Sequence, residues 1–480
     1  MRSWDAERVA GAAGARLLRA PRAEDATGPG GAGIDSRETV AGELFVGLKG
    51  GRSDGGAHAP AALRAGAWGV LVAPEHAAAA LAGDSAGAVL EHPDPLAGLQ
   101  ALALAWREQL GDGGTRVVAI TGSTGKTSTK DILAALLAPL ARTAASPANH
   151  NTEIGLPLAI LGAGEDVEVL VLEMAMRGPG QIAELTAIAR PEVGVIVNVG
   201  AAHLELLGSL EAIAAAKAEL IAGMAPGSTA VVPFAEPLLE GHLRADLQTV
   251  TFGGQGADVT LAERRPDGTV VIAVSGGEEL RLRPSFSQAH NLRNLLAAVA
   301  AARALGYTPA GEVRVEFSEM RGQRQPLAGG GVLIEDCYNA NPMSMRAALE
   351  DLAASAPGRR VAVLGEMLEL GEQGPELHRE LGRQAGAAGV ELLVAVGPLG
   401  EEIAAAFPGE GHTAADAAGA SRLAPGLIAP GDTVLVKGSR GVGLEVVCAA
   451  LRAGEPRAGA GEVPAAESDL RAHGAVSGPR

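Results

Sequence analysis

A glycine-rich run with one lysine, residues 121–127 (T-G-S-T-G-K-T), offers the clearest chemistry in the sequence. It follows an apolar, β-branched stretch that predicts a strand, and it precedes residues 131–137, which predict a helix. Backbone N–H groups at such a turn have no helical partner, and with the helix dipole they attract phosphate. The nucleotide-binding residues expected here are Gly122, Ser123, Thr124, Gly125, Lys126, Thr127 and Ser128.

Within this loop, Lys126 is placed to reach the terminal phosphates of a nucleotide, and the Thr127 hydroxyl is placed to bind Mg²⁺. The loop is about two residues shorter than the usual phosphate-binding pattern G-x-x-x-x-G-K-[ST]. An ordinary glycine–serine turn is therefore the alternative interpretation.

Two further polar side chains follow predicted strands in the middle of the chain. Glu173 ends the apolar stretch 167–172, and His203 follows the stretch 193–200. Ligands gather at the carboxyl ends of strands in an open α/β sheet, where the glycine-rich loop also lies. A carboxylate and an imidazole there could bind a metal ion that bridges a nucleotide and its acceptor. Taken singly, Glu173 could instead cap a helix, and His203 could be a loop histidine with satisfied hydrogen bonds.

Lys217 lies among alanines in a predicted helix whose N-cap is Ser209. Most helix lysines are solvated, and an ammonium group donates hydrogen bonds but cannot bind a cation. A lysine beside metal ions makes sense only as an ion-pair partner or after conversion to a carbamate, which is anionic.

The composition limits the class of protein. The chain has 480 residues, of which 47% are hydrophobic and only 2% aromatic, so we expect about three domains with aliphatic cores. A formal charge of −17 argues against broad nucleic-acid binding but allows a phosphorylated small molecule. Two cysteines exclude a disulfide framework and indicate a reducing compartment. Without an apolar leader or a run of about 18 apolar residues, we expect a cytoplasmic protein with no membrane insertion.

Three successive blocks of strand and helix patterns predict a three-domain α/β protein. Residues 1–112 predict a small α/β substrate module, and residues 113–313 predict a mostly parallel P-loop-type sheet with helices on both faces. The pattern restarts in residues 314–452, which predict a Rossmann-like α/β domain. Residues 453–480 lack hydrophobic periodicity and are expected to be disordered.

The outer domains carry candidate substrate-binding groups. Ser36 and Arg37 in the first module could hold a phosphate or a uracil–ribose group, although a solvated Arg37 paired with Asp35 is the alternative. Lys437 and Arg440 in the third domain could hold a substrate carboxylate, with a solvated loop as the alternative.

Five motifs resemble those of the Mur ligases, ATP-dependent enzymes that form amide bonds in peptidoglycan synthesis. In chain order they are 121–127 (TGSTGKT), 149–157 (NHNTEIGLP), 173–178 (EMAMRG), 198–205 (NVGAAHLE) and 216–219 (AKAE). Residues 290–298 (HNLRNLLAA) are similar to the family's helix near adenine. There are two departures. Ala175 stands where the family usually has glycine, and the strand at 231–234 lacks the Asn and Asp expected after it.

The resemblance implies roles for individual residues. A carbamylated Lys217 would bind Mg²⁺ with Glu173 and His203, while Thr127 binds a second Mg²⁺. The remaining implied roles are catalysis by Lys126, Lys217 and His203, ribose binding by Asp336, γ-phosphate contact by Arg324, adenine contact by Asn294 and Asn341, and UDP-sugar binding by Ser36 and Arg37.

The third domain points to one branch of this family. Residues 336–345 (DCYNANPMSM), 364–371 and 436–441 resemble the branch that adds D-alanyl-D-alanine to UDP-N-acetylmuramoyl-tripeptide, whereas tripeptide synthetases would show D-Y-A-H-x-P. The resemblance therefore implies an ATP-dependent ligase that works through an acyl phosphate, and we expect a monomer. The alternatives are another Mur-type ligase, such as a tripeptide or folylpolyglutamate synthetase relative, a P-loop NTPase switch, or an inactive scaffold.

Overall fold

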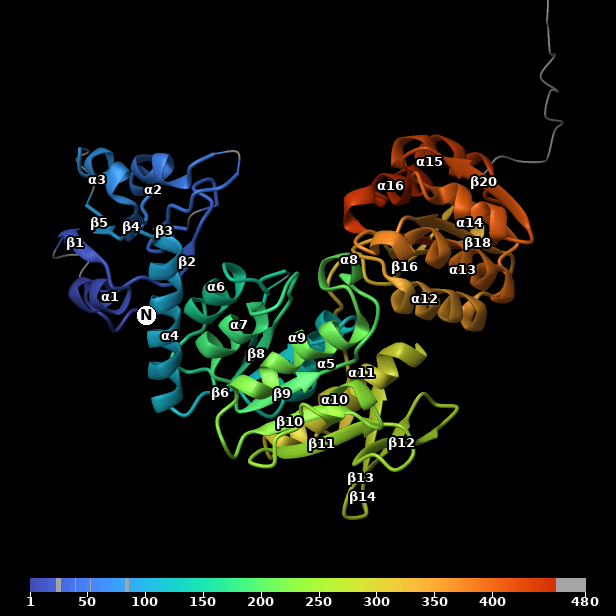
Figure 1. Ribbon diagram of the computed structural model, residues 1–480, viewed down its shortest axis with the longest axis horizontal. Helices are drawn as coiled ribbons and strands as arrows, with labels where there is room; N and C mark the ends of the chain where they lie inside the picture. The colour runs from blue at the N-terminus through green and yellow to red at the C-terminus, as the bar shows by residue number, and fades with distance from the viewer. Residues whose placement is uncertain (23–26, 39, 52, 83–85, 148, 455–480) are drawn as a thin grey trace, which may run out of the picture.

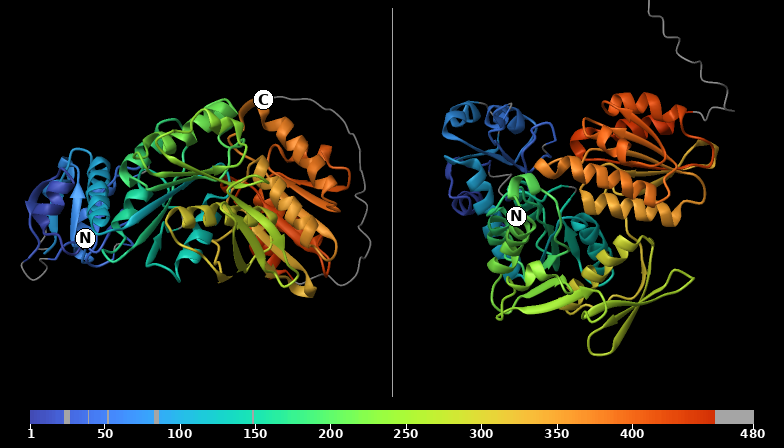
Figure 2. Two further views of the ribbon diagram at one scale, coloured as in Figure 1. Left: turned by 90° about the horizontal axis from the view of Figure 1, so that it is seen from below. Right: turned by 45° about the vertical axis from the view of Figure 1, so that its right-hand side comes forward.

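The chain forms three α/β units, and the central unit lies between the other two (Figure 1). The computed structural model describes residues 1–22, 27–38, 40–51, 53–82, 86–147 and 149–454. Residue 453 of the predicted tail is the last residue of a helix, and residues 455–480 lie outside the described residues. In the left view of Figure 2, the first unit (blue), the central unit (green to yellow) and the third unit (orange to red) follow one another along the molecule. This arrangement confirms the three-domain α/β architecture.

The first unit is a five-stranded sheet in the order β1-β5-β4-β3-β2, and all its pairs are parallel except β1 with β5. Its strands are β1 (Arg16–Arg19), β2 (Ala32–Gly33), β3 (Leu44–Val46), β4 (Gly69–Val72) and β5 (Ala88–Glu91). Its helices are α1 (Ala6–Ala12), α2 (Ala59–Arg64), α3 (Pro74–Leu81) and α4 (Pro95–Asp112).

Helix α4 joins the first unit to the central one. It begins at Asp94, whose carboxylate accepts hydrogen bonds from the first turn. Trp106 of this helix is fully buried, and its indole N–H donates to the Ala163 carbonyl at 3.0 Å. A single apolar cluster therefore continues from the first unit into the central unit, which stabilises their arrangement.

The central unit contains a ten-stranded sheet in the order β15-β14-β13-β12-β11-β10-β9-β6-β8-β7. The pairs from β7 to β12 are parallel, and two antiparallel hairpin pairings extend the sheet through β13 to β14. Its strands are β6 (Arg116–Thr121), β7 (Thr143–Ala145), β8 (Val169–Glu173), β9 (Val193–Ile196), β10 (Thr229–Pro233), β11 (Gln248–Gly253), β12 (Val259–Arg264), β13 (Val270–Val274), β14 (Glu278–Pro284) and β15 (Gly311–Val313).

Helices cover both faces of this sheet, as the continuous apolar strands require. One face packs against α5 and α11, and the other packs against α7 and α9. The helices are α5 (Lys126–Leu137), α6 (Gly155–Leu161), α7 (Gln181–Ala189), α8 (Leu204–Leu207), α9 (Leu210–Gly223), α10 (Pro237–Glu240) and α11 (Ala289–Ala304). Helix α5 begins at the phosphate-loop lysine, five residues before the start predicted from the apolar pattern.

The third unit is a six-stranded sheet in the order β16-β17-β21-β18-β19-β20, parallel except for the edge strand β16. Its strands are β16 (Gln323–Pro326), β17 (Val332–Asp336), β18 (Arg360–Gly365), β19 (Leu392–Val396), β20 (Glu410–Ala414) and β21 (Thr433–Lys437). Helices α12 (Pro342–Ser355), α13 (Gly374–Ala387) and α14 (Gly400–Ala406) cover one face, and α15 (Ala417–Leu423) and α16 (Glu445–Ala453) cover the other. Among the described residues, no helix combines the length and apolarity that a membrane span needs.

Candidate active site

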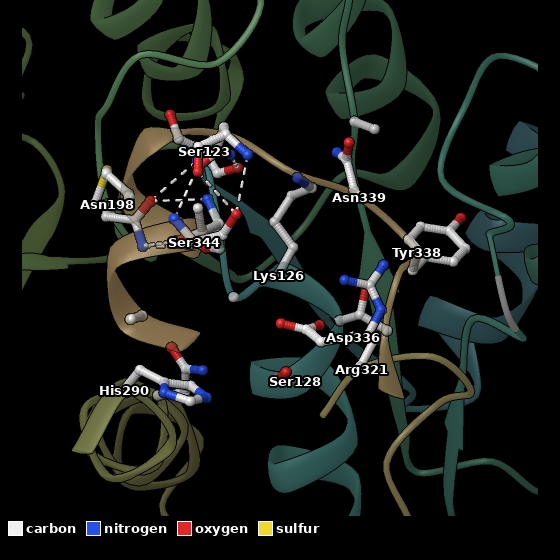
Figure 3. A pocket seen from close by; sticks show the side chains of 18 of the residues that line it. Ser123, Lys126, Ser128, Asn198, His290, Arg321, Asp336, Tyr338, Asn339 and Ser344 are labelled. Atoms are coloured by element: carbon white, nitrogen blue, oxygen red, sulfur yellow. Dashed lines mark hydrogen bonds between the residues drawn. The ribbon is translucent and has the colours of Figure 1, made fainter. Parts of the chain in front are cut away.

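A cavity of about 680 Å³ lies between the central and third units. The central unit supplies the glycine-rich loop, the carboxyl ends of β8 and β9, and the start of α11, while the third unit supplies the ends of β17 and β21 and the start of α12. Figure 3 shows side chains from these separate elements around one space. The sequence-predicted residues that line it are Ser123, Thr124, Gly125, Lys126, Thr127, Ser128, Glu173, His203, Asn294, Asp336, Asn341 and Lys437.

The glycine-rich loop connects β6 to α5 in a fixed conformation. Gly125 is the N-cap residue of α5 with φ 76°, and a Cβ there would lie 2.6 Å from Oδ1 of Asn294. Only glycine fits this position, because a side chain would meet both unfavourable backbone geometry and a buried neighbour. The Asn198 side chain accepts hydrogen bonds from the backbone N–H groups of Ser123 (3.1 Å) and Thr124 (2.9 Å). The loop is therefore fixed from the end of the adjacent strand.

Lys126 supplies a cation at this loop. Its ammonium group donates to the Gly122 carbonyl at 3.0 Å, so the side chain folds back over the loop. Burial lowers the pKa of Lys126, Glu173 opposes that shift, and Arg321 adds to it. Two cations in one cavity suit a ligand with several negative charges.

Thr127 and Glu173 lie together at the bottom of the cavity. The Thr127 hydroxyl donates to Oε2 of Glu173 at 2.8 Å, and the Asn151 side-chain amide donates to Oε1 at 2.8 Å. Glu173 is 1% exposed, and the two side chains that donate to it, Thr127 and Asn151, are neutral. A buried carboxylate with neutral donors fits a bound cation, and hydroxyl and carboxylate oxygens are the ligands that Mg²⁺ prefers.

His203 faces the same cavity and also contacts the third unit. Its Nδ1 is in hydrogen-bond contact with the Glu369 carboxylate. Burial is the largest influence on the pKa of His203 and lowers it, although Glu369 opposes this effect. A neutral imidazole whose Nδ1 faces a carboxylate carries its proton on that nitrogen, which leaves the Nε2 lone pair free to bind a metal.

A second hydrogen bond crosses the same interface. The Glu205 backbone N–H donates to the Glu369 carbonyl at 3.0 Å. His203 and Glu369 both have left-handed backbone conformations, with φ 61° and 62°. Such strain in non-glycine residues persists where the surroundings impose it, and it is common at functional sites. We call this pair of contacts the 203–369 latch.

Lys217 lies in α9, which begins at the predicted N-cap Ser209. The lysine is 2% exposed, and within the described parts of the chain no residue forms a hydrogen bond or ion pair with it. Burial is the main reason why the pKa of Lys217 lies well below its ordinary value, and the nearby charge of Lys126 adds to the effect. Lys217 is not one of the residues that line the cavity. A buried, neutral amine is the form of lysine that reacts with CO₂ to give a carbamate.

The third unit contributes an ion pair and a cap. Lys437 donates to Oδ2 of Asp336 at 2.7 Å and to the Asn339 carbonyl at 3.0 Å. Asn341 forms a capping box at the start of α12, and its amide donates to the Ser123 carbonyl at 3.3 Å. The third unit thus contacts the glycine-rich loop directly.

Six predicted residues lie outside the lining of this cavity. Arg324 donates to Asp351 (2.7 Å) and to Ser355 (2.6 Å), on the surface of α12. Arg37 pairs with Asp35 at 2.5 Å, which was the alternative interpretation from the sequence, and its side chain is 86% exposed. The six residues are Ser36, Arg37, Gly122, Lys217, Arg324 and Arg440.

The cavity also contains residues that the sequence did not single out. Arg321 lies with its guanidinium 4.2 Å from the centre of the Tyr338 ring, and both residues line the cavity. In Figure 3 Arg321 lies next to Tyr338, and its charge acts on Lys126, whereas Arg324 does not line the cavity. One signal for Arg321 was present in the sequence: residues 321–324 (R-G-Q-R) contain two arginines, and either could match the single arginine of the motif. Other lining residues lie inside the quoted motifs but had been assigned no role, among them Asn151, Asn198, His290 and Asn291.

Comparison with known proteins identifies the family. Residues 120–302 match the Mur ligase middle domain, and residues 318–440 match the Mur ligase, glutamate ligase domain. The chain belongs to the Mur ligase family. This finding confirms the family resemblance.

Within this family, the chain is similar to UDP-N-acetylmuramoyl-tripeptide–D-alanyl-D-alanine ligases. It is 37% identical to that of Synechocystis sp. over 431 residues, which cover 88% of this chain and 92% of the relative. A crystal structure of MurF from Acinetobacter baumannii superposes on this chain with a TM-score of 0.80. The two sequences are 28% identical, and the match covers 94% of this chain and 99% of that one. MurF from Thermotoga maritima in complex with ADP is 32% identical, with 88% and 97% covered and a TM-score of 0.74.

Proposed function

We propose that this chain is a cytoplasmic, monomeric, ATP-dependent ligase that joins D-alanyl-D-alanine to UDP-N-acetylmuramoyl-tripeptide. The products are UDP-N-acetylmuramoyl-pentapeptide, ADP and phosphate. Support comes from the similarity to UDP-N-acetylmuramoyl-tripeptide–D-alanyl-D-alanine ligases over 88% of the chain. The observation that carries the proposal is the cavity in which the glycine-rich loop and Glu173 face Asp336 and Lys437 of the third unit.

The reaction requires an activated carboxyl group, because a carboxylate is a poor electrophile. Attack of the tripeptide carboxylate on the γ-phosphorus of ATP gives an acyl phosphate and ADP. The dipeptide amine then attacks the acyl carbon, the C–O bond to phosphate breaks, and the ammonium proton is lost to form the amide. Water must be excluded while the acyl phosphate exists, which suits a site enclosed between two units.

The chain's own residues hold the anions in place for these steps. The N–H groups of the loop and Lys126 bind the phosphates, and Arg321 takes the place near the γ-phosphate that the resemblance gave to Arg324. Asp336 binds ribose and is oriented by Lys437. Asn294, Asn341 and the start of α11 surround adenine.

Glu173, His203 and Lys217 as a carbamate would hold one Mg²⁺, and Thr127 would hold a second. When bound, Mg²⁺ neutralises phosphate charge during phosphoryl transfer. The support is the chemistry of the donors, which include a buried carboxylate beside a hydroxyl and a histidine whose Nδ1 is oriented by Glu369. The low pKa of Lys217 favours the neutral amine that carbamylation needs.

We further propose the domain limits 1–112, 113–313 and 314–452. The first domain would hold the UDP-sugar, with Ser36 and Arg37 as contacts. Lys437 and Arg440 would face a substrate carboxylate, which for Arg440 requires movement from its present contact with the Met320 sulfur.

Phosphate release in the presence of UDP-tripeptide and ATP, with and without D-alanyl-D-alanine, tests this proposal. We expect stoichiometric phosphate and pentapeptide only when the dipeptide is present. Phosphate release that needs no amine acceptor would indicate an NTPase switch. Amide formation only with a single diamino acid and a UDP-dipeptide would indicate a tripeptide synthetase.

A further inference from the structure

The two cysteines of the chain meet in the core of the third unit. Cys337 directly follows β17, and Cys448 lies in α16. Both thiols are free, and the residues are 1% and 0% exposed. Their Sγ atoms and a carboxylate oxygen of Glu335 all lie within 4.8 Å of one another. Two rare residues, distant in sequence, thus form one cluster of potential metal ligands.

The local fold directs all three donors to one place. Glu335 and Cys337 are two residues apart on an extended chain, so their side chains lie on the same side, which α16 covers. Asp336 between them lines the active-site cavity instead. The Glu335 carboxylate accepts hydrogen bonds from Arg452 of α16 (2.7 Å) and from Gln325 (3.2 Å). It is therefore oriented before any ligand arrives.

We infer that Cys337, Cys448 and Glu335 form a binding site for one thiophilic divalent cation of the Zn²⁺ or Cd²⁺ type. Two thiolates and a carboxylate carry three negative charges, and Arg452 and a divalent ion together carry three positive charges. The net charge of the occupied site is then zero, which suits a buried site because uncompensated charge is costly there. A monovalent ion would leave one negative charge.

The spacing also fits such an ion. Zn–thiolate bonds of about 2.3 Å at tetrahedral angles separate the two sulfurs by about 3.8 Å. Atoms that already lie within 4.8 Å of one another must approach by about 1 Å at most.

Titration of the metal-free, reduced full chain with Cd²⁺ tests this site, with thiolate-to-Cd²⁺ charge-transfer absorbance as the readout. The active-site ligands contain no sulfur, so Cd²⁺ bound there does not produce this signal. We expect one Cd²⁺ per chain, competition by Zn²⁺, and loss of the signal in Cys337→Ala and Cys448→Ala. Glu445→Gln, on the same helix, should retain the wild-type signal.

Glu335→Gln provides a test that leaves both thiols in place. We expect it to keep the charge-transfer signal but to require at least tenfold more Cd²⁺. No signal in the wild-type chain with excess Cd²⁺, or an undiminished signal in Cys448→Ala, would overturn the assignment. A Cys337–Cys448 disulfide in protein purified without reductant would also overturn it, because the pair would then be a redox site.

Discussion

Replacement of Glu369 by alanine tests whether the 203–369 latch, which joins the central and third units, also orients His203 for a metal ion. The variant loses the carboxylate that orients His203 but retains the backbone hydrogen bond from Glu205 to residue 369. A hydrogen bond to a charged group contributes about 1.5–3 kcal/mol when it is well shielded. Because the His203 and Glu369 side chains remain 23% and 35% exposed, we expect about 1 kcal/mol here.

Loss of about 1 kcal/mol weakens the contact between the central and third units by about fivefold. The imidazole also loses its fixed orientation. Removal of the hydrogen-bond partner of a metal-ligating histidine typically weakens metal binding by about 10- to 100-fold. We therefore expect Glu369→Ala to bind Mn²⁺, as a probe for Mg²⁺, about tenfold more weakly. Glu369→Gln keeps a hydrogen-bond acceptor and should fall between alanine and wild type.

Mn²⁺ binding to the nucleotide-free enzyme, followed by electron paramagnetic resonance, separates this effect from turnover. Glu372→Ala is the matched control, because Glu372 is an exposed glutamate three residues further along the same segment. Wild-type Mn²⁺ affinity and turnover in Glu369→Ala would refute the proposed role of the latch.

Four other outcomes follow from the same site. Lys126→Ala should lower ATP-dependent phosphate release at least about a hundredfold, because a cation at the phosphates is lost, and wild-type turnover would contradict its role. Lys217→Ala should be nearly inactive and partly rescued by a small carboxylate; a mass spectrum of native protein without added CO₂ mass would count against carbamylation. Arg321→Ala should reduce kcat strongly, while Arg324→Ala should leave kcat within about twofold; the reverse order would restore the original assignment. Gly125→Ala should weaken ADP binding in calorimetry, since its Cβ would lie 2.6 Å from Asn294; unchanged affinity would show that the loop tolerates the side chain.

Much of the active site was predictable because its chemistry is local in sequence. The glycine-rich loop combines a strand end, a left-handed glycine and a helix start within a few residues, and each of these features follows from short-range backbone preferences. Glu173 and His203 were placed beside it because parallel strands end at the same edge of a sheet. The structure brings both residues to the cavity.

The sequence was less informative where two similar residues lie close together and only one reaches the site. Arg321 and Arg324 differ little in sequence context, yet only Arg321 lines the cavity. Pairing of β16 with β17 begins between them, and Arg324 pairs with Asp351 on the surface of α12. Motif spacing alone cannot separate two such arginines, because the register of a strand depends on its partner.

The class of chemistry could be predicted from the residues alone, since phosphate binding, strand order along the chain and aliphatic cores depend on local pattern and composition. Only the tertiary structure decided which distant groups meet, including Glu369 with His203, Asp336 with Lys437, and Cys337 with Cys448. Such contacts join segments separated by long stretches of chain, and their geometry is set by how whole units pack together.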